Sequence, residues 1–254
     1  MQLAGSVALV TGASRGVGKA IALALADAGA DVACAARATA SAPLKLPGTV
    51  DDTVRAVEVR GRRGLAVPTD LSQPAQVEAM VARTVAHFGR LDVLVNNAAI
   101  TFAGDLALPM KRWDLCMEVN LRAPVLAIRA ALPALRARGQ AAILNVSSAA
   151  AVMPVPGLLV YGVSKAALER LTTGIAVELA PDGIAVNCFR IDVPIASEGF
   201  VYNAPELDTS KWEPTEVGAE GALWMLRQPP SFTGEVLGIT DLRLHGVARS
   251  RVRR

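Results

Sequence analysis

Tyr161 and Lys165 are four residues apart in a stretch whose pattern predicts a helix over 159–180. Residues at this spacing project from one side of a helix, so the phenol and the ammonium are expected to be neighbours. A free tyrosine has a pKa of about 10, and a nearby ammonium lowers it because it favours the phenolate. The pair therefore predicts a group that exchanges a proton with a substrate oxygen.

Ser147 and Ser148 follow an apolar run at 142–146 and precede this pair in the chain. Adjacent residues of a strand point to opposite faces of the sheet, so only one of the two hydroxyls is expected to face Tyr161. The strand pattern alone leaves open which of them does so.

A glycine-rich turn lies near the start of the chain, between an apolar run at 7–11 and a helical pattern at 16–28. Glycines let a backbone turn tightly and approach a phosphate, and the start of a helix offers free N–H donors to an anion. The turn predicts a pyrophosphate site, with a purely structural tight turn as the alternative. Its expected binding residues are Thr11, Gly12, Ser14, Arg15, Gly16, Val17 and Gly18.

Apolar runs of strand length alternate with helical segments along the whole chain. Most of the runs lack a polar–apolar alternation, as expected for strands that are buried on both faces. The predicted strands cover 7–11, 30–36, 65–68, 92–95, 142–146, 184–189 and 235–239, and the predicted helices cover 16–28, 51–61, 74–88, 111–138, 159–180 and 214–227. This order predicts one α/β domain over 1–254, of the Rossmann type, with a doubly wound, mostly parallel, seven-stranded sheet between helices.

The composition narrows the function classes. The chain has 254 residues, 52% of them hydrophobic, and a formal net charge of +3. The basic excess gathers in a tail at 246–254, which we interpret as a solvated end. Nucleic-acid binding is not expected, because the sequence has no basic stretch with interleaved aromatic residues. Three widely spaced cysteines, an odd number, favour a reducing, cytoplasmic setting.

Neither a metal site nor a membrane-spanning segment is expected. Neither of the two histidines has a partner at ligand spacing. No secretory signal is expected at the start of the chain. The uncharged stretch 141–164 contains asparagine, serine, proline and glycine, so it predicts a buried strand, a loop and a helix start instead of a membrane span.

Four motifs in this order resemble those of the short-chain dehydrogenase/reductase family, over the chain up to about Val186. They are the glycine turn with the spacing TGxxxGxG, Asp70-Leu71 after the third strand, Asn96-Asn97-Ala98-Ala99 after the fourth, and Tyr161-x-x-x-Lys165 preceded by a serine. The resemblance implies hydride transfer between a nicotinamide cofactor and an alcohol or carbonyl carbon, with Tyr161 as acid–base. The three-residue spacer between Tyr161 and Lys165 separates the chain from the enoyl-reductase branch.

The resemblance also implies roles for single residues. Family spacing selects Ser148 to polarise the substrate carbonyl and Asn120 to hold a water that links Lys165 to solvent. A core amide that kinks its helix is the alternative for Asn120. Asp70 is expected to bond the adenine with Leu71 beside it. Along the rest of the cofactor the resemblance places Asn97, Ala98, Tyr161 and Lys165, and for Asn97 a structural turn amide is equally open.

The end of the second strand predicts which nicotinamide cofactor binds. In this fold an acidic residue there selects NAD, whereas a basic one accommodates the 2′-phosphate of NADP. The sequence reads Ala35-Ala36-Arg37, and Arg15 in the glycine turn is a second cation. Arginine pairs well with phosphate, so NADP(H) is expected.

The segment after the sixth strand departs from the family, because 190–197 lacks the usual Pro-Gly pair. Common spacing would make Pro194 the backbone donor to the nicotinamide, but proline has no N–H. A register shifted by one residue places Ile195 there and Ser197 in the position of the family threonine. This longer loop and the insert between Arg37 and Thr49 resemble the hydroxysteroid dehydrogenase-like subgroup.

Two functions remain to be compared. The first is an active oxidoreductase for a small, hydrophobic alcohol or carbonyl substrate, with 198–214 as a substrate lid, and the second is a catalytically weak NADP-binding sensor or regulatory protein. Candidate pocket residues, which are equally candidates for core or subunit contacts, are Val152, Met153, Val155, Leu158 and Trp212. Helices at 111–138 and 159–180 are expected to associate copies of the chain into a homodimer or homotetramer.

Overall fold

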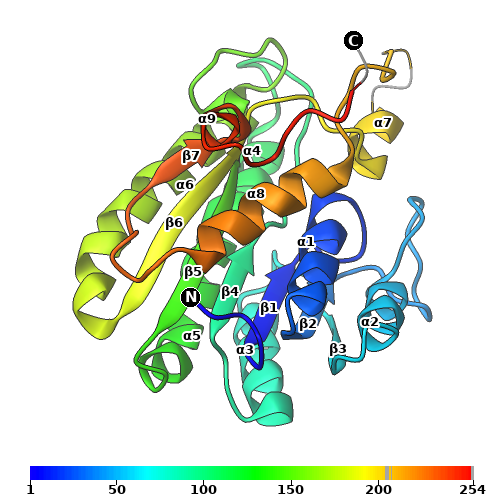
Figure 1. Ribbon diagram of the computed structural model, residues 1–254. Coiled ribbons are helices and arrows are strands. Elements are labelled where there is room, and N and C mark those ends of the chain that lie inside the picture. The colour runs from blue at the N-terminus through cyan, green and yellow to red at the C-terminus, as the bar shows by residue number, and fades with distance from the viewer. Residues whose placement is uncertain (204–205, 207, 253–254) are drawn as a thin grey trace.

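The computed structural model describes residues 1–203, 206 and 208–252, and its centre is a seven-stranded sheet (Figure 1). All strand pairs are parallel, in the order β3-β2-β1-β4-β5-β6-β7. The strands are β1 (Val7–Thr11), β2 (Asp31–Ala36), β3 (Gly64–Pro68), β4 (Val93–Asn96), β5 (Ala141–Ser148), β6 (Ile184–Ile191) and β7 (Val236–Gly238). The predicted fold class and all seven predicted strands are confirmed.

Helices cover both faces of this sheet. They are α1 (Gly16–Asp27), α2 (Val50–Glu58), α3 (Pro74–Phe88), α4 (Met110–Met117), α5 (Ala123–Arg136), α6 (Leu159–Leu179), α7 (Glu198–Asn203), α8 (Thr215–Arg227) and α9 (Ile239–Leu244), with shorter turns η1 (Glu118–Arg122), η2 (Ala149–Ala151) and η3 (Ala180–Asp182). One apolar core lies between the sheet and α1, α2, α8 and α9, and a second lies between the sheet and α3, α5 and α6. Figure 1 shows α1 and α8 side by side across the near face.

The predicted helix over 111–138 is wrong as a single α-helix. It is divided into α4, the π-helical turn η1 and α5, and the Ala123 N–H bonds the Glu118 carbonyl five residues earlier. Pro124 has no N–H to donate to the carbonyl of Asn120, so an unbroken α-helix would lack that bond. The wider turn places Asn120 at the bend.

The carboxyl ends of β1 and β4 meet at the point where the strand order reverses. Such switch points are where open α/β sheets bind ligands, because the connections diverge there to opposite faces. The glycine turn follows β1, the Asn97 turn follows β4, and Ser148 ends β5. The sheet thus brings three of the predicted motifs to one edge.

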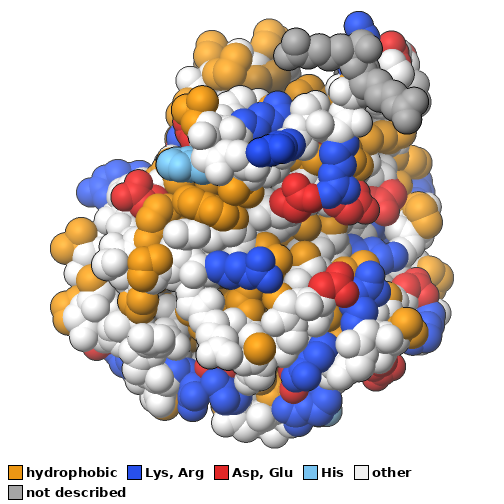
Figure 2. Space-filling model, in the orientation of Figure 1, with side chains coloured by type: hydrophobic (Ala, Val, Ile, Leu, Met, Phe, Trp, Pro, Cys, Tyr) orange, Lys and Arg blue, Asp and Glu red, His pale blue; other side chains and the backbone are white. Residues whose placement is uncertain are grey.

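The described part of the tail is docked, and our expectation of a solvated end at 246–254 is wrong for it. Glu213, which is 4% exposed, accepts bonds from Arg243 (2.6 Å), from the Ser250 hydroxyl (2.5 Å) and from the Arg251 N–H (2.9 Å). Figure 2 shows cationic and anionic side chains interspersed over this region. Residues 253–254 of the tail and 204–205 and 207 of the predicted lid lie outside the described residues.

None of the helices in the described residues combines the length and apolar character needed to cross a bilayer. Within the same residues, no group of three or more histidine, cysteine, aspartate or glutamate side chains is placed to hold a metal ion.

Candidate active site

The first two turns of α6 position Tyr161 and Lys165 on the same side, as their spacing predicts. The Lys165 side chain is 2% exposed, and its Nζ donates to the carbonyl of Val146 in β5 at 2.7 Å. The same Nζ lies 5.7 Å from the centre of the Tyr161 ring. The ammonium is therefore held between the end of β5 and the face of the phenol.

Ser148, the last residue of β5, lies against Tyr161. Its hydroxyl accepts from the Ala150 N–H at 3.3 Å, and its interaction with the Tyr161 side chain acts to lower the pKa of the phenol. Ser147 is 2% exposed, and its Oγ has no hydrogen-bond partner among the described residues. The alternation along β5 thus places Ser148, and not Ser147, beside the phenol.

Burial dominates the electrostatics of this pair. It raises the pKa of Tyr161 to about 12, although the Ser148 hydrogen bond acts in the opposite direction. It lowers the pKa of Lys165 to about 8, against the charges of Cys188, Cys116 and Glu169. Our expectation of a lowered phenol pKa is wrong for this structure, because burial disfavours the charged phenolate more than the interaction with Ser148 favours it.

Asn120 is fully buried in η1 and fastens three parts of the site together. Its Oδ1 accepts from the Ile100 N–H at 2.9 Å, and its Nδ2 donates to the Ile100 carbonyl at 2.9 Å and to the Ser164 hydroxyl at 3.0 Å. Ser164 precedes Lys165 in α6. The side chain of Asn120 therefore acts as the core amide at a helix kink, and its proposed water-holding role rests on the resemblance.

The glycine turn is shaped by close approach to the Asn97 turn. A Cβ on Gly12 would lie 2.8 Å from Asn97 Nδ2, and one on Gly18 would lie 2.3 Å from the same atom. The Thr11 hydroxyl accepts from the N–H groups of Asn97 (3.0 Å) and Ala98 (3.1 Å), and Asn97 Nδ2 donates to the Thr11 carbonyl at 2.9 Å. Asn97 therefore joins the ends of β1 and β4, the structural reading that the sequence left open.

A carboxylate from far along the chain reaches this turn. Glu198 Oε2 accepts from the Gly16 N–H, the first of α1, at 2.8 Å. A Cβ on Gly16 would lie 3.3 Å from the Ser197 Cβ, so the loop that holds Ser197 covers the turn. Ile195 is 6% exposed beneath this loop. Sequence reasoning missed Glu198, because no spacing motif links residues 16 and 198.

Of the two arginines predicted to favour NADP(H), Arg37 and Arg15, one is hydrogen-bonded within the protein. Arg37 is exposed directly after β2, but Arg15 donates its Nε to the Pro47 carbonyl at 2.8 Å. Its Nη2 donates to the carbonyls of Leu46 (3.0 Å) and Gly48 (3.1 Å). Arg15 thus fastens the insert onto the glycine turn, and burial lowers its pKa.

Asp70 and Leu71 follow β3 at the same edge of the sheet. One Asp70 carboxylate oxygen accepts from the Ser72 N–H at 3.0 Å and from the Ser72 hydroxyl at 2.8 Å. Leu71 is partly buried against the core that contains α3. Part of the Asp70 carboxylate is therefore used to shape the turn before α3.

Side chains fasten the end of β6, where the family's Pro-Gly pair is missing. Arg190 forms two bonds to the Glu169 carboxylate of α6, at 2.7 and 2.9 Å. Asp192 accepts from the Thr240 N–H at 3.1 Å and from the Thr240 hydroxyl. The sequence could not reveal these contacts, since their partners lie on other elements at no fixed spacing.

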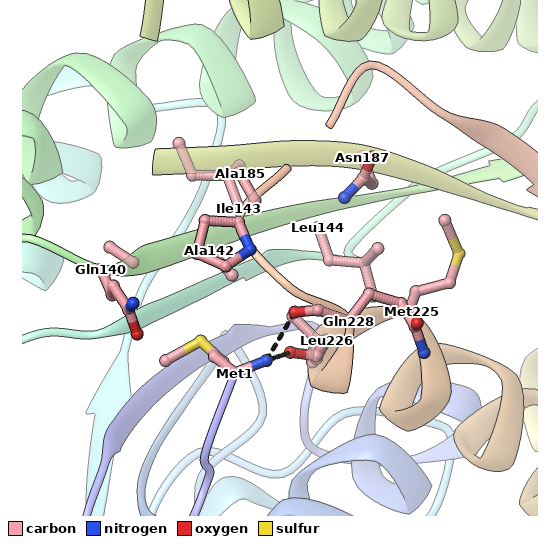
Figure 3. Close-up of a pocket in the computed structure, with 12 residues that line it drawn as sticks. Met1, Gln140, Ala142, Ile143, Leu144, Ala185, Asn187, Met225, Leu226 and Gln228 are labelled. Atoms are coloured by element: carbon pink, nitrogen blue, oxygen red, sulfur yellow. Dashed lines mark hydrogen bonds between the residues drawn. The ribbon is translucent and has the colours of Figure 1, made fainter. Parts of the chain in front are cut away.

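Three of the apolar residues that were candidates for a substrate pocket are exposed. Val152, Met153 and Val155 are 58%, 60% and 40% exposed, so they are not core residues. The small hollow in Figure 3 lies at the other end of β5 and β6 from Tyr161. There the Met1 amino group bonds the carbonyls of Leu226 (3.1 Å) and Gln228 (2.6 Å), so this hollow is separate from the predicted chemistry.

Comparisons with known proteins agree with this arrangement. The sequence pattern of the short chain dehydrogenase family matches residues 6–193. Hydroxysteroid dehydrogenase-like protein 2 from Pongo abelii is 35% identical over 251 residues, which are 97% of this chain and 59% of that protein. The chain therefore spans less than two thirds of this curated relative.

Two solved structures share the fold. L-Sorbose reductase from Gluconobacter frateurii, in complex with NADPH and L-sorbose, has a TM-score of 0.84 at 28% identity and covers 94% of this chain and 97% of its own. A short chain dehydrogenase from Burkholderia cenocepacia J2315, in complex with NADP, has a TM-score of 0.80 at 34% identity, with the same coverage.

The resemblance to the hydroxysteroid dehydrogenase-like subgroup, inferred from the insert and the longer loop, agrees with the similarity to hydroxysteroid dehydrogenase-like protein 2. The match of the family pattern covers most of the chain, and the order of the strands and motifs agrees with it. The chain belongs to the short-chain dehydrogenase/reductase family.

Proposed function

We propose that this protein is an NADP(H)-dependent oxidoreductase that moves a hydride between the nicotinamide and an alcohol or carbonyl carbon of a small, hydrophobic substrate. The observation that carries the proposal is the grouping of Ser148, Tyr161 and the buried Lys165 at the carboxyl edge of the sheet, with Lys165 Nζ over the Tyr161 ring. The cofactors bound in the two solved relatives support NADP(H).

The residues of the glycine turn fit a dinucleotide. A Cβ on Gly12 or Gly18 would collide with Asn97, so only glycine at these positions lets the turn pack this closely against the end of β4. The Gly16 N–H already donates to an anionic group, the Glu198 carboxylate, at the position where a phosphate would accept its hydrogen bond. We place Asp70, Leu71, Ala98, Ile195 and Ser197 along the rest of the cofactor by family position.

In the proposed mechanism the bound nicotinamide supplies or accepts the hydride, and the protein handles the proton. Ser148 donates a hydrogen bond to the substrate oxygen, and Tyr161 gives that oxygen its proton during carbonyl reduction. Lys165 holds a positive charge beside the phenol and stabilises the phenolate that remains. Alcohol oxidation follows the same path in reverse.

The missing Pro-Gly pair favours one alternative, a sensor or regulatory protein that binds NADP but turns over slowly. Monitoring NADPH absorbance with a panel of aldehydes and ketones separates the two. We expect turnover of at least one apolar carbonyl compound. Tight NADPH binding with no turnover of any compound would support the alternative instead.

Arg37 is expected to set the cofactor preference. The charge reversal Arg37→Asp should lower the ratio of kcat/KM for NADPH to that for NADH by about ten- to a hundredfold, because a charge-assisted bond to the 2′-phosphate is replaced by repulsion. Steady-state kinetics with both cofactors measure the ratio. The control is Arg83→Asp, which changes an exposed arginine on α3 and should leave this ratio unchanged. An unchanged ratio in Arg37→Asp would refute the assignment.

Exposed apolar side chains on α4 and α6 support the proposal of a homodimer or homotetramer. Leu115, Leu159 and Val163 are 37%, 42% and 42% exposed, and Val177 is 78% exposed. Multi-angle light scattering at micromolar protein should give two or four times the chain mass, and a monomer would contradict the proposal.

The three cysteines are buried and free, which suits the proposed cytoplasmic setting.

A further inference from the structure

Glu198 supplies an anion to the start of α1 from the far end of the chain. The first N–H groups of a helix have no partner within it, and the helix dipole favours negative charge there. Arg15, at the N-cap of α1, makes no side-chain cap, and the first turn holds no acidic residue. Glu198 Oε2 accepts from the Gly16 N–H at 2.8 Å and also faces the charge of Arg15.

The loop that carries Glu198 is anchored on both sides of it. Before it, Ile195 pairs with Glu213 as an isolated bridge, with the Ala196 N–H on the Glu213 carbonyl at 2.9 Å. After it, the Phe200 N–H bonds the Ser197 carbonyl at 3.0 Å, and the Phe200 ring meets Trp212 edge-on at 4.8 Å. These contacts hold α7 over the glycine turn with its carboxylate directed at Gly16.

We propose that Glu198 competes with the cofactor's pyrophosphate for the glycine turn, an inference that rests on the proposed function. One N–H cannot give its full bond to both anions, and the two negative charges repel each other. Binding of the dinucleotide must therefore displace the Glu198 side chain from the Gly16 N–H. The contact lowers cofactor affinity and couples the position of this carboxylate on α7 to whether the cofactor is bound.

The test compares cofactor binding by the full chain and by Glu198→Gln and Glu198→Ala, using NADPH fluorescence. Both variants should bind NADPH with a Kd about three- to tenfold lower than that of the unaltered chain, because the competing charge at the helix start is gone. The matched control Glu178→Gln changes an exposed carboxylate in the last turn of α6 and should leave the Kd unchanged.

A second ligand separates competition at the turn from a general charge effect. The nucleotide 2′-AMP has the 2′-phosphate but no pyrophosphate, so its Kd should be the same with and without Glu198. Equal NADPH affinity in all forms, or an equal gain for 2′-AMP, would overturn this inference alone. Failure of every form, including the unaltered chain, to bind NADPH would overturn the proposed function as well.

Discussion

Tyr161→Phe is expected to reduce the rate of carbonyl reduction by about a hundred- to ten-thousandfold, the usual contribution of a positioned proton donor. The substitution removes the hydroxyl that interacts with Ser148 but keeps the ring whose centre lies 5.7 Å from Lys165 Nζ. Affinity for NADPH should therefore stay unchanged while kcat falls. Steady-state kinetics and a fluorescence titration on the same preparations measure the two quantities.

The chain offers a matched control for this substitution, since it has two tyrosines. Tyr202 lies in α7, within the predicted substrate lid, and is 53% exposed. Tyr202→Phe makes the same chemical change and should lower kcat far less than Tyr161→Phe, because its hydroxyl is not the proposed proton donor. Equal rates for Tyr161→Phe and Tyr202→Phe would show that the phenol of Tyr161 is not the proton donor.

Lys165→Met is expected to abolish most of the activity and yet to stabilise the fold at neutral pH. Burial lowers the pKa of Lys165 from its ordinary 10.5 to about 8, which corresponds to roughly 3 kcal/mol against folding. The lost charge-assisted hydrogen bond to the Val146 carbonyl is worth roughly 1.5–3 kcal/mol and offsets much of this gain. The midpoint of thermal unfolding at pH 7 should rise slightly.

The pH dependence of this gain identifies its cause. The pKa of Lys165 is lower in the folded chain, so the unfolded chain binds this proton more tightly and the cost is fully present below about pH 8. The cost disappears as pH rises towards 10.5, so the advantage of Lys165→Met should shrink over that range. The exposed Lys111→Met on α4 is the control and should change neither stability nor rate. A variant that is less stable than the unaltered chain at both pH 7 and pH 10 would contradict this explanation.

The fold was predictable because parallel strands that are buried on both faces leave continuous apolar runs in the sequence. The residues of β1 are all buried, and the predicted bounds 7–11 are those observed. The ends of β5 and β6 extend beyond the predictions, to Ser148 and Ile191, because Ser147, Ser148 and Arg190 interrupt the apolar runs that located the strands. Apolarity therefore located the strands but not their carboxyl ends, where the site lies.

Local spacing predicted the parts of the site that are close in sequence. Tyr161 and Lys165 share a helix, and their relation followed from its geometry. The division of the 111–138 helix was also readable, because Pro124 follows Asn120 by four residues. Arg15 and Glu198 were not predictable in this way, since their partners come from loops 31 or more residues away. The prediction of a lowered pKa for Tyr161 was wrong for another reason, because this pKa depends on the burial of the phenol, which the spacing of residues does not show.

Tracing deuterium from NADPH labelled at the transferable C4 position is the most direct test of Tyr161 as the proton donor in hydride transfer. With a carbonyl compound that the enzyme reduces, mass spectrometry of the alcohol should show one deuterium on the carbinol carbon, formed at a rate that depends on Tyr161. Tyr161→Phe should bind the labelled cofactor and form almost no labelled alcohol. Label that stays in the cofactor with the unaltered chain, or label transfer that is equally fast in Tyr161→Phe, would contradict the account.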